Sequence, residues 1–188
     1  MFRTITGVAL LVSLTVSQFG CHANSARIAL QRPAQPAEMN AFAPFVGSWT
    51  WTAKETTSGD AARTWSGTTK WEWALDNRCL HGQLTARAGD LSYDSTGMWT
   101  WNVSKRQYQF WMFNNWGYPR EGVAHYNAAD KSWTMPYRCT GLDGTNSHGR
   151  YTIKFIDDNT FDWTMTEWAD ALHMVKKIEL AGQYKRSK

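Results

Sequence analysis

The chain has 188 residues, including 12 Trp, 7 Tyr and 8 Phe, and a formal net charge of +4. This length fits a single domain that can bury a core of its own. The Lys and Arg residues are scattered singly among Thr, Glu and Asp rather than gathered into a basic stripe, which argues against a nucleic-acid partner.

The first segment, residues 1–23, has the pattern of a secretory signal peptide. Arg3 precedes the apolar run 5–16, which is too short to span a bilayer. Two processing routes fit the sequence: a bacterial lipoprotein signal in which Cys21 is lipidated, or cleavage after Ala23. We therefore predict export to the periplasm or cell envelope, with membrane attachment only through a lipid anchor on the cysteine.

Between this segment and the main domain, residues 24–36 are rich in Ala, Gln, Arg and Pro and predict a flexible linker. The stretch 36–47 predicts one short helix, because apolar residues such as Phe42 and Phe45 recur at roughly helical spacing. We expect this helix to cover one end of the domain formed by residues 37–188.

After Gly47 the apolar residues follow a period of two, which is typical of strands with one dry and one wet face. Short turn signals separate about ten such segments: 48–57, 63–75, 78–88, 96–103, 106–114, 120–128, 131–140, 148–156, 159–167 and 172–182. Closing this antiparallel meander buries the apolar face and removes open edges. The expected fold is all-β: an antiparallel up-and-down β-barrel of about ten strands with a short N-terminal capping helix.

Two strands depart from the simple alternation. The segment 109–113 is apolar on both faces, which predicts an outer neighbour such as the 36–46 helix or the linker. Pro136 removes a backbone donor from the seventh strand and predicts a bulge or a bend there.

The two cysteines of the barrel domain lie on strands that run in the same direction. Cys79 begins the third expected strand and Cys139 ends the seventh, so they fall at opposite ends of the barrel. A disulfide needs Cα atoms within about 7 Å. We therefore predict two free thiols.

Several stretches resemble the bacterial family known as domain of unknown function 1579: "FVGSWTWTAKET", "ALDNRCLHGQL", "TGMWTWNVSKRQYQFWMF", "REGVAHYNA" and "IKFIDDNTFDWTMTE". The family's opening Gly-x-Trp is present at 47–49, and its Leu-x-x-Arg-x-Leu-x-Gly step is present at 75–82. Tyr108 and Trp111 are one residue closer than in its Tyr-x-x-x-Trp strand. The resemblance covers about residues 42–185. It implies a ten-stranded, calycin-like (lipocalin-like) barrel, and it implies no established activity or catalytic residues.

The chain carries no recognisable catalytic motif. Its five histidines are not spaced as metal ligands, and the carboxylates of Glu72, Glu121, Asp162 and Glu167 form no pair suited to hydrolysis. A haem-binding, nitrobindin-like barrel is a related possibility, and it needs an inward histidine near the C-terminus. His173 is the candidate for that ligand. Otherwise no cofactor and no metal are predicted.

A barrel of ten strands is wide enough to hold a cavity, and aromatic cavities with a few polar groups suit small apolar or planar molecules. The residues expected to face the lumen are Trp49, Trp51, Trp71, Trp73, Trp99, Trp101, Trp133, Tyr137 and Trp163. The polar residues expected at its rim are Arg78, Asn114, Arg120 and Arg138.

These residues predict a monomer or weak dimer that binds a small hydrophobic or aromatic-compatible ligand. Two alternatives stay open: an enzyme or haem protein that uses the same cavity, and a structural envelope protein whose lumen is filled by its own rings.

Overall fold

The computed structural model describes residues 34–57, 62–141, 144–169 and 172–187. The predicted signal peptide, with Cys21, and nearly all of the predicted linker lie outside these residues. Within the described part of the chain, no helix is long and apolar enough to cross a membrane.

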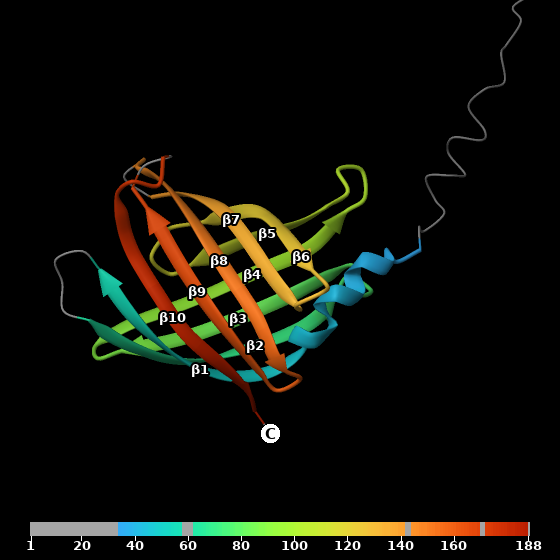
Figure 1. Cartoon of the computed structure of the whole chain (residues 1–188), viewed down its shortest axis with the longest axis horizontal. Coiled ribbons are helices and arrows are strands. Elements are labelled where there is room, and N and C mark those ends of the chain that lie inside the picture. The colour runs from blue at the N-terminus through green and yellow to red at the C-terminus, as the bar shows by residue number, and fades with distance from the viewer. Residues whose placement is uncertain (1–33, 58–61, 142–143, 170–171, 188) are drawn as a thin grey trace, which may run out of the picture. The chain divides into compact units, whose positions relative to one another are not determined.

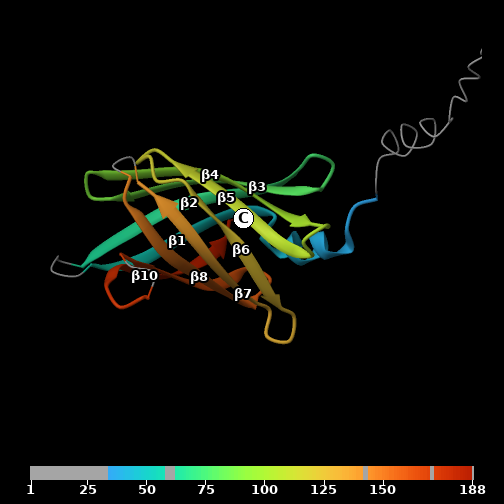
Figure 2. The same ribbon diagram turned by 90° about the horizontal axis from the view of Figure 1, so that it is seen from above.

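One short 3-10 helix, η1, at Ala37–Phe45, precedes ten antiparallel strands in the sequence. The strands close into a barrel (Figures 1 and 2). The strands are β1 Gly47–Thr57, β2 Arg63–Ala74, β3 Cys79–Ala88, β4 Leu91–Asn102, β5 Gln107–Asn114, β6 Arg120–Asn127, β7 Ser132–Thr140, β8 Asn146–Asp157, β9 Thr160–Trp168 and β10 Lys176–Arg186. Each strand pairs with its neighbours in sequence, and β1 pairs with β10 to close the barrel. This confirms the predicted up-and-down barrel with its N-terminal helix.

The period-two pattern of the sequence is the inside–outside pattern of the barrel. On β1, Trp49 and Trp51 are buried, whereas Thr50 and Thr52 between them are exposed. Further along the same strand, Glu55 lies on this inner face and is also buried. A charged side chain therefore lies on the inner face near the end of this strand.

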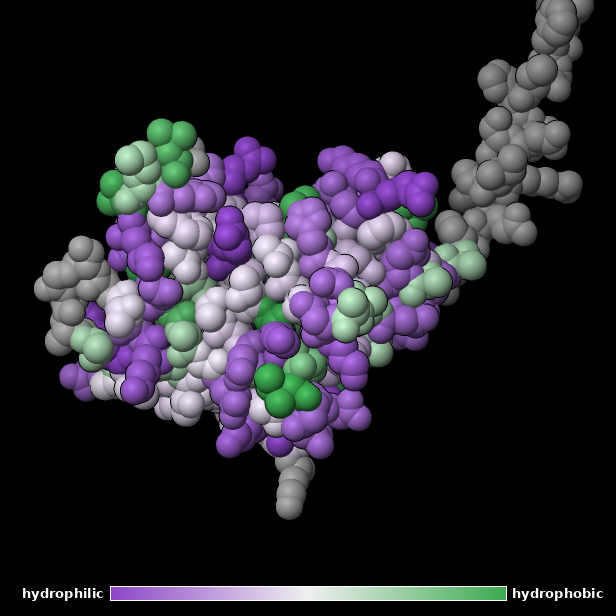
Figure 3. Space-filling view, viewed as in Figure 1, coloured by the Kyte–Doolittle hydropathy of each residue, from purple (hydrophilic) through white to green (hydrophobic). Residues whose placement is uncertain are grey.

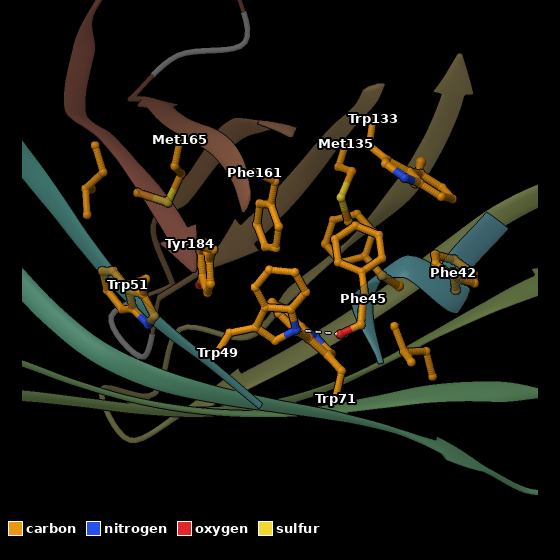
Figure 4. Packing of buried hydrophobic residues seen from close by; sticks show 14 of the residues in the cluster. Phe42, Phe45, Trp49, Trp51, Trp71, Trp133, Met135, Phe161, Met165 and Tyr184 are labelled. Atoms are coloured by element: carbon orange, nitrogen blue, oxygen red, sulfur yellow. Dashed lines mark hydrogen bonds between the residues drawn. The ribbon is translucent and has the colours of Figure 1, made fainter. Parts of the chain in front are cut away.

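The helix η1 plugs one end of the barrel with three apolar side chains, Met39, Phe42 and Phe45, all nearly inaccessible to solvent. Figure 4 shows Phe42 and Phe45 among the inward rings. Phe42 stacks on Trp133 with ring centroids 4.8 Å apart, and Phe45 meets Phe155 edge to face at 4.9 Å. The rings fit together in offset-stacked and edge-to-face contacts, so this end of the lumen is filled.

Polar contacts fix the plug where β1 and β10 meet. The indole N–H of Trp49 donates a hydrogen bond to the Phe45 carbonyl oxygen at 2.7 Å, drawn as a dashed line in Figure 4. Arg186 donates to the carbonyl oxygens of Val46 at 2.6 Å and Pro44 at 2.9 Å. Its guanidinium carbon also lies 4.3 Å from the centre of the Trp49 ring. One arginine thus satisfies the helix end and packs on the first inward tryptophan.

The outer face of β5 differs from the prediction. Trp111 and Phe113 point outward and remain 37% and 59% exposed. The helix does not cover them, because it lies in the end of the barrel, where Tyr108 donates a hydrogen bond to the Glu38 carbonyl oxygen. The expectation that the helix packs outside this strand is therefore wrong.

At Pro136 the structure shows an interrupted ladder rather than a bulge. The β6–β7 pairing breaks off after Gly122 and Tyr137 and resumes at His125 and Thr134. The register is the same on both sides of the break, so no extra residue is inserted. The proline lies within the gap because it has no N–H to donate.

Cys79 and Cys139 are free thiols at the two opposite ends of the barrel. The strand directions had predicted this separation.

Replacing Arg186 with Met should loosen the plug. The substitution leaves the Val46 and Pro44 carbonyls without their charged donor and removes the contact with Trp49. We expect the free energy of unfolding to fall by about 2 kcal/mol, measured by urea titration. Lys185→Met, on the exposed face of the same strand, is the control and should change stability little. Equal stability of the two variants would contradict the anchoring role.

Candidate binding cavity

A cavity of about 460 Å³ occupies the part of the lumen that the plug leaves unfilled. Phe42 and Phe45 of the plug contribute to its lining at one end. Arg63 and Trp116, both partly exposed, contribute at the opposite end, which we call the mouth. Figure 3 shows that the outer surface seen from one side is mostly hydrophilic, with a few separate hydrophobic spots. Nine of the twelve tryptophans are either buried or packed against the core.

The residues predicted to face the lumen all point inward. Five are buried: Trp49, Trp51, Trp71, Trp133 and Tyr137. Four are partly buried and pack against the core: Trp73, Trp99, Trp101 and Trp163. Those that line the cavity itself are Trp51, Trp71, Trp99, Trp133 and Trp163. The remaining four belong to the packed rings and to the support of the cavity wall.

A glycine on β3 lets two of these rings lie flat against the sheet. A Cβ atom on Gly82 would come within 2.6 Å of Trp71 and 2.8 Å of Trp99. Any side chain at this position would push the indoles into the cavity. Gly82 therefore helps to define the volume left for a ligand.

The predicted rim residues fall in four different environments. Asn114 is at the mouth, where its side-chain oxygen accepts hydrogen bonds from the backbone N–H groups of Trp116 and Tyr118. Both of those aromatic residues line the cavity. Asn114 therefore shapes the loop that carries them.

Two of the other rim predictions are wrong in position, and the third residue lines the cavity at greater depth than expected. Arg78 lies in the turn between β2 and β3, at the plugged end. Arg138 points outward because it follows the inward Tyr137, and it is exposed. Arg120 lies inside the barrel, with its side chain only 11% exposed.

Arg120 is the centre of a polar cluster in the cavity wall. Its guanidinium donates to the Tyr93 hydroxyl at 2.7 Å and lies 3.5 Å from a carboxylate oxygen of Glu167. Glu167 is buried and also accepts hydrogen bonds from Tyr137 at 3.0 Å and Ser147 at 2.9 Å. Five strands supply these side chains to one point near the mouth. The carboxylate is therefore held in a fixed position by three donors.

A second glycine allows this geometry. A Cβ atom on Gly149 would lie 2.0 Å from the Tyr137 ring. The ring can cross β8 only because the glycine has no side chain, and this brings the Tyr137 hydroxyl to Glu167.

Burial and charge set the ionisation of the cluster. Burial is the largest cause that raises the pKa of Tyr137 and of Tyr151 well above the ordinary value for tyrosine. Burial acts to lower the pKa of Arg120, but the surrounding tyrosines and Glu167 outweigh it and raise that pKa well above its ordinary value. At neutral pH the cavity wall therefore presents a guanidinium cation and protonated hydroxyls.

A smaller polar group lies at the mouth. The buried carboxylate of Glu55 accepts a hydrogen bond from the indole N–H of Trp65 and lies 3.4 Å from Arg63. All three residues line the cavity.

The positions of the histidines decide whether His173 could hold a haem in this cavity. No histidine of the described residues is among its lining. His173 is exposed, and its ring stacks on the ring of Trp168 with centroids 4.3 Å apart. Trp168 directly follows the inward-facing Glu167, so it does not belong to the inner face of its strand. The described part of the chain also contains no group of three His, Cys, Asp or Glu residues that could hold a metal ion. The residues present therefore do not fit haem bound through His173.

Comparison with known proteins places the fold and not the family. No protein-family model and no curated sequence matches the chain. The chain is similar to the structure of Rv2717c from M. tuberculosis, with TM-score 0.63, 13% identity and coverage of 82% of this chain and 100% of that one. It is similar to the S-type phycobiliprotein lyase CpeS from Guillardia theta, with TM-score 0.56, 7% identity and coverage of 81% and 94%. At these identities the likeness shows the fold alone. The fold and cavity together define a closed, ten-stranded up-and-down β-barrel with an internal cavity.

Removing Arg120 alone should destabilise the protein strongly, since the buried Glu167 would lose its charged partner. We expect Arg120→Met to lower the free energy of unfolding by about 3–5 kcal/mol. Adding Glu167→Gln should recover most of this loss, because the double variant buries no net charge. Urea titration of both variants measures the difference, and a double variant no more stable than the single one would contradict the pairing.

The buried tyrosines predict a loss of stability in alkali. Tyrosines of the unfolded chain ionise near pH 10.0. In the folded protein the pKa of Tyr184 lies above that value, and burial is the largest cause. The stabilising contribution is therefore complete below about pH 10 and is lost as the pH rises toward the folded pKa. Urea titrations from about pH 8 to 11 should show this decline. Tyr184→Phe should make the decline shallower, and an unchanged slope would contradict the assignment.

Proposed function

We propose that this protein binds a small, largely apolar ligand with a ring system in the cavity of its barrel, without catalysing a reaction. The observation that carries the proposal is the aromatic-lined cavity of about 460 Å³, a volume within the range of small-molecule sites. Apolar rings supply contact area, and a few polar side chains at one side supply orientation.

The distribution of the rings supports binding over a purely structural role. At the plugged end they touch one another directly, as Phe42 does with Trp133. Beyond the plug the lining residues come from opposite sides of the closed strand order, such as Trp99 on β4 and Trp163 on β9. The space between these walls is the cavity, so the protein's own side chains do not fill the lumen.

We further propose that the protein is exported, that it belongs to the family known as domain of unknown function 1579, and that it acts as a monomer or weak dimer. The signal pattern of residues 1–23 and the motifs at 47–49 and 75–82 support the first two points. Intact-mass measurement of the mature protein tests export and distinguishes a lipid on Cys21 from cleavage after Ala23.

Filling the cavity should abolish binding. Leu84 lines the cavity from β3, and Leu84→Trp places a bulky indole ring in that space. We expect this variant to bind the neutral fluorescent probe N-phenylnaphthylamine at least about tenfold more weakly than the parent, a loss of about 1.4 kcal/mol. Fluorescence titration measures it.

The control is Gln83→Trp, which adds the same ring to the exposed face of the same strand and should leave affinity unchanged. Native mass spectrometry of the parent, as purified and with a lipid and metabolite panel, gives a second readout. A parent that binds neither the probe nor any panel member would contradict the proposed function.

A further inference from the structure

The polar side of the cavity contains more hydrogen-bond donors than acceptors. Arg120 has five N–H donors, and among the described residues only the Tyr93 hydroxyl and Glu167 accept from them. The contact with Glu167 is the longer one, at 3.5 Å. Most of the hydrogen-bonding capacity of this guanidinium therefore remains unused, although its side chain is nearly buried.

Two tyrosine hydroxyls add to this excess. Tyr93 uses its oxygen to accept from Arg120, so its proton is free to be donated. Tyr151 lines the cavity close enough to Arg120 for their charges to interact, and burial keeps its pKa high, so it also carries a proton at neutral pH. Among the described residues neither hydroxyl has an acceptor for that proton. Glu167 already accepts hydrogen bonds from the hydroxyl groups of Tyr137 and Ser147.

The charge of the lining points in the same direction. The ionisable residues of opposite sign that line the cavity are Arg63, Arg120 and Lys177 against Glu55 and Glu167. Among the described residues this leaves one positive charge in excess, which is that of the exposed Lys177. An anionic ligand would lower this net charge, whereas a cation would add to it.

We infer that the ligand is an amphipathic anion: an apolar ring body lies among the tryptophans, and a carboxylate or other anionic oxygen group accepts hydrogen bonds from Arg120, Tyr93 and Tyr151. This inference rests on the proposed function and adds the chemical class of the ligand. Charge-assisted hydrogen bonds of this kind are about twice as strong as neutral ones, and low water content strengthens them further.

Two fluorescent probes with one framework separate the anionic group from the apolar body. N-phenylnaphthylamine is neutral, and anilinonaphthalene sulfonate is the same framework with a sulfonate. We expect the parent protein to bind the sulfonate probe at least about tenfold more tightly. The preference should persist in about 0.5 M salt, because a buried pair is screened less than surface lysines are. Leu84→Trp should abolish binding of both probes, which places them in the cavity.

The variants remove donors while leaving the net charge of the cavity unchanged. Tyr151→Phe removes one hydroxyl, and the double variant Arg120→Met with Glu167→Gln removes the buried charges together. Each should lower the affinity for the sulfonate probe by about tenfold and change the affinity for the neutral probe by less than about twofold. The matched control is Arg138→Met with Glu121→Gln, which removes the same charges from a register pair on the outside of β6 and β7 and should change neither affinity.

The outcomes separate the inference from the proposed function. If the parent binds the neutral probe in the cavity but has no preference for the sulfonate, the anionic ligand is wrong and the proposed function stands. If the donor variants weaken both probes equally at unchanged thermal stability, the cluster only shapes the cavity, and the inference is again wrong. If the parent binds neither probe, both proposals are wrong.

Discussion

The pairing of β1 with β10 is the interaction on which the other features of this structure depend. It joins the first and last strands from Trp49 and Arg186 to Thr57 and Ile178, and so turns an open meander into a closed wall. Without closure the inward tryptophans would form an exposed apolar sheet face, and two edges would be open to other chains. The same pairing brings Arg186 beside Trp49 and onto the helix that plugs the lumen.

Closure and the plug make the two ends of the barrel different. At the plugged end Phe42, Phe45 and Trp133 pack against one another, and every ring has an aromatic neighbour. Nearer the mouth, the wall contains charged and hydroxyl-bearing side chains, with Arg120 and Glu167 among them. The first region gives stability through buried apolar area, whereas the second leaves polar atoms around a space.

Strand alternation predicted the inner face well because it depends only on the two-residue period. It correctly turned the tryptophans inward, and it could have placed Glu167 inside as well, two residues after the inward Met165. It could not give depth along the barrel axis. Arg120 begins its strand and was therefore expected at the rim, but the side chain extends inward to the hydroxyl of Tyr93 and to Glu167. That contact joins strands far apart in sequence, so no local pattern contains it.

The buried Arg120–Glu167 pair is hard to explain by stability alone. Two charges removed from water cost several kcal/mol each, and apolar residues of similar volume often replace such pairs without loss. The plugged end shows that this chain can fill a barrel with aromatic rings. The mouth side instead keeps a cation whose donors are largely unused, beside an open volume. An acceptor supplied by a bound molecule would satisfy those donors, and this is the physical reason to regard the cluster as a recognition element.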